Sequence, residues 1–129
     1  MAAVTISANA SVDISTAQYA MQLSGKVAGE DINAGQPVYL KQSDDKIYKF
    51  ATGKIFIGIA ARTAKAGEPI TVFGLGTRFY VSSTALTGDL YYVNVAGAID
   101  TTATTDDTVG AFARVSANDL MIVKVGKLN

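Results

Sequence analysis

Residues 57–62 read Ile-Gly-Ile-Ala-Ala-Arg, and the pattern returns 52 positions later at residues 109–114 as Val-Gly-Ala-Phe-Ala-Arg. Of the 18 positions that begin at residue 57, five are identical to those 52 positions later. Similar turns, strands and glycines that recur in the same order indicate a duplicated β unit. Neither copy of the pattern carries a combination of side chains that performs catalysis.

The similarity also extends upstream. Residues 34–40 resemble residues 87–93, now at an offset of 53. We therefore place the two copies at about residues 34–76 and 87–128. The alignment further predicts that matched aliphatic residues occupy equivalent buried sites, namely Ile57 with Val109 and Ile70 with Ile122.

The strand signals are dense from residue 26 onward. Residues 36–42 and 47–50 flank the turn-forming Ser43–Lys46 and predict a hairpin. Further short apolar runs follow, separated by glycine-containing turns. This spacing predicts an all-β fold, a small barrel or sandwich of about 8–10 short strands. We expect residues 26–129 to form one β domain.

Residues 1–25 differ from the rest, because Asp13 is their only charged side chain. We interpret them as an N-terminal extended arm, with short extended segments around Val4–Ile6 and Val12–Ile14 and, as an alternative farther along, a short helix at residues 15–22. An extended peptide can add to an exposed sheet edge, so we predict that the arm lies across a neighbouring subunit. The candidate contact residues to such a subunit, either another copy of this chain or a different protein, are Ile6, Val12, Ile14, Tyr19 and Met21.

The composition disfavours several classes of function. Lys plus Arg and Asp plus Glu both number 11, so the chain lacks the basic excess typical of nucleic-acid binders. There is no cysteine and no histidine, which removes thiolate ligands and the commonest general base. No run approaches the 18 apolar residues of a membrane span. We expect no enzyme activity, cofactor, metal, nucleic acid or membrane partner.

The charged motifs give weak signals. The three carboxylates in residues 100–108, the pair Asp44–Asp45 and the pair Glu30–Asp31 all fit solvent-exposed loops. Arg62 and Arg114 occupy matching places in the two copies. They are candidate interface residues that bind acidic groups, or alternatively outward-facing charges at strand ends.

Residues 28–40 read Ala-Gly-Glu-Asp-Ile-Asn-Ala-Gly-Gln-Pro-Val-Tyr-Leu, and a hairpin ending in Lys46–Lys49 follows. With Phe56–Ala60 and Ala66–Val72, this stretch resembles the capsid cement, or decoration, proteins of tailed phages over about residues 28–76.

The resemblance implies a β-rich protein, often a homotrimer, that binds the outer surface of the icosahedral head. There it would hold neighbouring major capsid proteins together, after synthesis in the bacterial cytoplasm. It supplies no catalytic residues. The alternative is another phage structural β module, from a tail, baseplate or head fibre.

Overall fold

A computed structural model describes residues 3–12 and 21–129, and these fold into two antiparallel sheets. The all-β prediction is confirmed. The described strands are β1 (Ala3–Val4), β2 (Ser11–Val12), β3 (Gln22–Val27), β4 (Pro37–Lys41), β5 (Lys46–Lys49), β6 (Gly58–Ala60), β7 (Pro69–Phe73), β8 (Arg78–Tyr80), β9 (Leu90–Asn94), β10 (Ala98–Asp100), β11 (Phe112–Arg114) and β12 (Asp119–Ile122). A single 3-10 turn, η1 (Val95–Gly97), separates β9 from β10.

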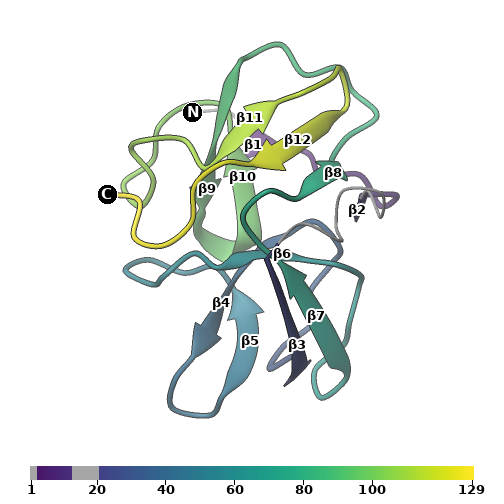
Figure 1. Ribbon diagram of the computed structural model, residues 1–129, viewed down its shortest axis with the longest axis vertical. Helices are drawn as coiled ribbons and strands as arrows, with labels where there is room; N and C mark the ends of the chain where they lie inside the picture. Colours follow the sequence, from purple (N-terminus) through teal and green to yellow (C-terminus); the bar gives the residue numbers. More distant parts are fainter. Residues whose placement is uncertain (1–2, 13–20) are drawn as a thin grey trace.

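The two sheets have the same strand order once the arm is set aside. The first sheet runs β3-β7-β6-β4-β5, and the second contains β8-β12-β11-β9-β10 in the corresponding positions. They form the lower and upper halves of the molecule in Figure 1. The duplicated unit is therefore a five-stranded antiparallel sheet. Its first strands, β3 and β8, lie upstream of the sequence match, and β3 begins within the stretch that we assigned to the arm.

The hairpin registers of the two units correspond residue by residue. Leu40 lies opposite Ile47 in the first hairpin, and Val93 lies opposite Ile99 in the second. These pairs are related by the offsets of 53 and 52 that the sequence shows. The hairpin is thus the part of the unit in which sequence repeat and structural repeat coincide.

The register between β4 and β6 differs from that between β9 and β11, and one prediction fails there. Val38 lies opposite Gly58, but its counterpart Tyr91 lies opposite Phe112 instead of Gly110. Val109 consequently precedes β11 and is 43% exposed, whereas Ile57 is half-buried, so these two residues do not share equivalent buried sites.

Gly58 explains why β6 and β11 differ. Its φ is +149°, and a Cβ there would lie 2.2 Å from the Phe73 carbonyl oxygen. Only glycine lets β6 approach β7 in this way. The expected burial of Ile70 and Ile122 is confirmed, since both side chains are nearly inaccessible.

The two sheets close in different ways. In the first, Ala28, which follows β3, forms a parallel bridge with Ile47 of β5, so the two edge strands meet. In the second, β10 pairs with β1 and β8 pairs with β2. Ser7, between the two arm strands, donates its N–H to the Val81 carbonyl at 2.7 Å. The arm therefore covers both edges of the second unit.

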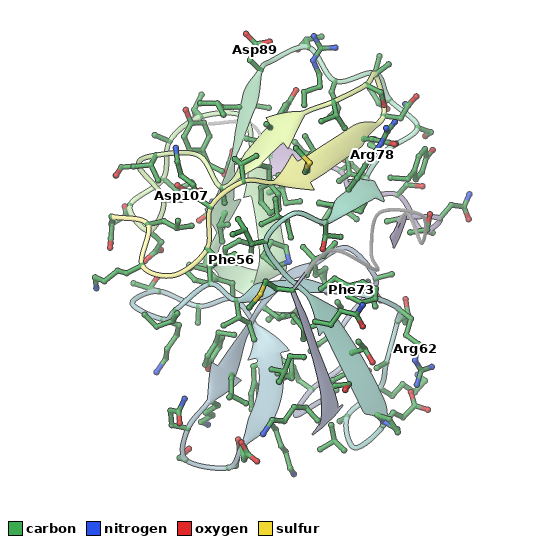
Figure 2. The ribbon with its side chains drawn as sticks, viewed as in Figure 1. Phe56, Arg62, Phe73, Arg78, Asp89 and Asp107 are labelled. Atoms are coloured by element: carbon green, nitrogen blue, oxygen red, sulfur yellow. The ribbon has the colours of Figure 1, made fainter. Side chains whose placement is uncertain are left out.

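The sheets share a hydrophobic core. Each unit has a cluster of buried side chains, but Phe50, Phe56 and Ile59 of the first unit belong to the cluster of the second. The ring of Phe56 meets that of Phe112 edge to face, with centroids 5.6 Å apart. Figure 2 shows Phe56 at the junction between the halves. The shared core couples the two units.

Candidate interaction surface

The predicted arm residues do not gather into one surface. Ile6 is half-buried against the core of the second unit, and Val12 lies opposite Phe79 in the β2–β8 pair. Met21 is 67% exposed. Ile14 and Tyr19 lie outside the described residues, as does most of the alternative helix at residues 15–22. Met21 therefore presents a largely exposed side chain, whereas Ile6 does not.

The expected placement of the arm across a neighbouring subunit is wrong for β1 and β2. These strands do add to sheet edges as predicted, but both edges belong to their own chain. The physical reason is that the second unit lacks the direct closure of the first. Its edges therefore offer unpaired backbone groups within reach of the arm.

Arg62 and Arg114 bind backbone carbonyls, each within its own unit. The Arg62 guanidinium donates to the Pro69 carbonyl at 2.9 Å, and that of Arg114 donates to the Gly88 carbonyl at 3.0 Å. Arg114 also lies 4.0 Å from Asp89. Arg62 and Asp89 appear in opposite halves in Figure 2. The two arginines therefore do not build a common site, and their role at an interface stays a prediction.

An apolar patch lies where the two units meet. Phe56 pairs with Gly126 in an antiparallel bridge, with Phe56 buried. Because side chains alternate along extended backbone, its neighbours Ile55 and Ile57 point away from Phe56. Ile57 is half-buried and packs against the core of the first unit, whereas Val125, across the bridge, is exposed. Ile55 is 51% exposed.

This patch continues toward the start of β3. Met21 donates its backbone N–H to the Leu75 carbonyl at 3.2 Å. The intervening Gly74 lies against both Met21 and the Ile57 carbonyl. We call the set Met21, Ile55, Ile57, Leu75 and Val125 the junction patch. Contiguous exposed apolar groups of this kind mark contact sites on soluble proteins.

A groove of about 410 Å³ opens beside the junction patch, between β4 and residues 53–57. Tyr39, Leu40, Ile55 and Ile57 supply its apolar lining. Lys54, which also lines it, places its ammonium 5.5 Å from the Tyr39 ring centroid. The ammonium of Lys41 lies 5.0 Å from the Tyr48 ring. The groove thus combines apolar walls with positive charge.

A hydrogen bond orders the hairpin next to the groove. The Tyr48 hydroxyl donates to the Asp44 carboxylate. This bond is the main reason that the pKa of Asp44 lies below its ordinary value and that of Tyr48 lies above its own. Lys26 pairs with Asp45 at 2.7 Å on the same turn. The Asp44–Asp45 motif is therefore an exposed hairpin turn, held in shape by its neighbours.

The interpretation of residues 100–108 as a solvent-exposed loop is wrong. Asp100, Asp106 and Asp107 are all buried. Each finds hydrogen-bond donors inside the protein: Asn94 donates to Asp100, and Thr52 and Gly53 of the first unit donate to Asp106. Burying a carboxylate is tolerated only with such partners. Asp106 thereby links the two units.

Asp107 has the most extensive network. Its Oδ2 accepts the N–H groups of Val93 and Ala111, and its Oδ1 accepts those of Val109 and Gly110, at 2.8–3.1 Å. Figure 2 shows Asp107 within the loop on the C-terminal half. No local sequence signal distinguishes such a carboxylate from an exposed one, because its donors come from two separate segments.

The described residues contain no cluster of acidic, cysteine or histidine side chains suited to a metal ion. Nor does the part of the chain that the structure describes include a helix long and apolar enough to cross a membrane. What the described surface offers instead is a groove and an apolar patch.

Two joined antiparallel sheets with exposed apolar surface at their junction are typical of a small β protein that acts by contact with other proteins. A comparison with family models matches the phage cement protein family over residues 1–75. The match spans 75 of the 129 residues, and the chain belongs to the phage cement protein family. A comparison with curated proteins finds no match. The family is one of structural phage proteins that stabilise the capsid, which confirms the sequence-based resemblance.

Proposed function

We propose that this protein binds the outer surface of the assembled phage head as a homotrimer and holds neighbouring major capsid proteins together. The observation that carries the proposal is the family match, which includes the arm and the first unit. The mechanism is mass action, because a protein that binds only the assembled shell stabilises that shell. Trimers suit local threefold positions, where symmetry multiplies weak contacts.

The junction patch and the groove are the surfaces that we assign to these contacts. Apolar burial at the patch supplies affinity, and Met21 is its most exposed member. Arg62 and Arg114 are exposed and are secondary candidates, since each already binds a carbonyl of its own chain.

The test uses phage heads that lack the protein. Purified protein is added to these heads, co-sedimentation measures binding, and the temperature of DNA release measures stabilisation. We expect saturation at a copy number comparable to that of the capsid protein and a raised release temperature. Binding restricted to a few copies at one vertex or on the tail would contradict the proposal and indicate another structural module.

A further inference from the structure

We propose that the groove between β4 and residues 53–57 binds an extended, acidic segment of the capsid shell protein, which adds to β4 as a short extra strand. This inference rests on the proposed function, because it names the partner of a surface already assigned to the shell. Its evidence is the free backbone of β4, the charge of the groove and its apolar lining.

The backbone of β4 is paired on one side along its length and on the other side only at its beginning. Pro37 and Val38 pair with β6, whereas β5 pairs with residues 38–41. Beyond Val38 the chain before β6 diverges, because Phe56 bonds to Gly126 instead of to β4. The split between β4 and residues 53–57 is the groove.

Leu40 presents its main chain to this split. Hydrogen-bonding direction alternates along a strand: the carbonyls of Pro37 and Lys41 accept from Phe50 and Asp45 on the β5 side, and that of Val38 accepts from Ile57 on the other. Leu40 is two residues after Val38, so its N–H and C=O point in the same direction as those of Val38 and face the groove. Among the described residues nothing bonds to them there. A free strand edge with one donor and one acceptor accepts an extended peptide.

The charge of the groove selects an acidic occupant. Lys54 forms no ion pair with any described residue, and its ammonium is positioned by the Tyr39 ring. Lys41 is held likewise over Tyr48 and also faces Asp44, whose carboxylate is engaged by the Tyr48 hydroxyl. Carboxylates of a bound segment would be attracted to both ammonium groups at little conformational cost, because the rings already restrict the lysines.

The apolar lining of the groove indicates which apolar residues the bound segment carries. Ile55 and Ile57 face the same side of their segment, and Tyr39 closes the opposite wall. In an extended peptide, alternate side chains point the same way. The fitting segment therefore has apolar residues at alternating positions and carboxylates within reach of Lys54 and Lys41, which lie beside the stacked rings of Tyr39 and Tyr48.

A photo-crosslinking experiment on decorated heads identifies the occupant. Ile55 is replaced by p-benzoylphenylalanine, the heads are irradiated, and the crosslinked peptides are identified by mass spectrometry. We expect crosslinks to one acidic, apolar-alternating segment of the shell protein. Crosslinks only to a second copy of this chain, or only to basic segments of the shell, would overturn the inference.

Matched substitutions provide the second readout. The double variant Lys54→Gln with Ile55→Asn should bind heads at least about tenfold more weakly than wild type, with an unchanged melting temperature. The control pair, Lys65→Gln with Val115→Asn, alters an exposed lysine and an exposed valine that do not line the groove, and it should bind like wild type.

The outcomes separate the two proposals. If wild-type protein fails to bind heads, the proposed function fails, and this inference fails with it. If wild type binds and the groove variant binds equally well, the groove inference alone is wrong. A shallower salt dependence of the groove variant would support the charge argument, because fewer ion pairs then form on binding.

Discussion

Asp107 holds four backbone N–H groups from two segments with a single buried carboxylate. Asn at this position would present one oxygen and an amide N–H₂ to these donors, leaving some of them unpaired. Each unsatisfied buried group costs about 1–3 kcal/mol. We therefore expect Asp107→Asn to lower the free energy of unfolding by about 3 kcal/mol or more in urea titrations.

Asp89→Asn is the matched control for this substitution. The Asp89 side chain is 99% exposed and lies 4.0 Å from Arg114, and such surface pairs contribute little. Its effect should stay within about 0.5 kcal/mol. A loss of that small size for Asp107→Asn would show that the carboxylate is not needed to order its loop.

The Tyr48–Asp44 bond gives a prediction for pH. Because this bond is the main cause of the lowered pKa of Asp44, Tyr48→Phe should raise that pKa toward 3.8, as measured by NMR titration of the carboxyl carbon. A lowered carboxyl pKa contributes stability above its unfolded value, and this contribution is lost as pH falls.

The stability difference between wild type and Tyr48→Phe should therefore be present near pH 7 and shrink below about pH 4. It should also shrink above about pH 10, because the raised pKa of Tyr48 contributes stability that is lost as pH rises through it. An unchanged pKa of Asp44 in Tyr48→Phe would contradict the assignment. Thermal melts across this pH range provide the second measurement.

Single residues also show what the sequence could and could not predict. The alternation and turn composition around residues 36–50 are local, so the first hairpin was predictable. The burial of residues 100–107 was not, because the donors to Asp106 are Thr52 and Gly53 of the first unit and Asp107 also accepts from Val93 of β9. The groove was likewise hidden, since it depends on where residues 53–57 leave β4 to pair with Gly126.

Among the strands, β1 and β2 cover the edges of the second unit and contribute to its stability. Their removal uncovers the edges of β10 and β8 and takes Val4 and Ile6 away from the core. We expect a variant lacking residues 1–12 to melt cooperatively at a lower temperature. It should also associate beyond the wild-type oligomer, because uncovered edges pair with other chains. Circular dichroism and sedimentation velocity measure the two effects.

Ile6→Ala is the control for the truncation. It reduces apolar contact but leaves both edges covered, so a small loss of stability without new association is expected. If the truncated protein associates no more than Ile6→Ala does, the arm strands do not protect the edges. If it is unfolded, the arm belongs to the folding core, and the proposed division between an arm and a domain from residue 26 fails.

The molecule as a whole should unfold as one cooperative unit, because aromatic residues of the first unit lie in the core of the second. Phe56→Ala should cost about 3–5 kcal/mol, and calorimetry of wild type should show a single transition with equal calorimetric and van't Hoff enthalpies. Val109→Ala, at the exposed matching position, should change stability by about 0.5 kcal/mol or less. Two separate transitions in the wild type would show that the units are independent.

The pairing of β1 with β10 has a consequence for the order of events during synthesis. β1 and β2 are synthesised before their partners, because Val4 precedes its partner Ile99 by 95 residues and Val12 precedes its partner Phe79 by 67 residues. The pairs that β1 and β2 make therefore cannot form until the second unit has been synthesised. Contacts between such distant segments slow folding. Residues 3–12 carry no charged side chain and few large apolar ones. They therefore offer little surface for incorrect association before the edges of β8 and β10 form.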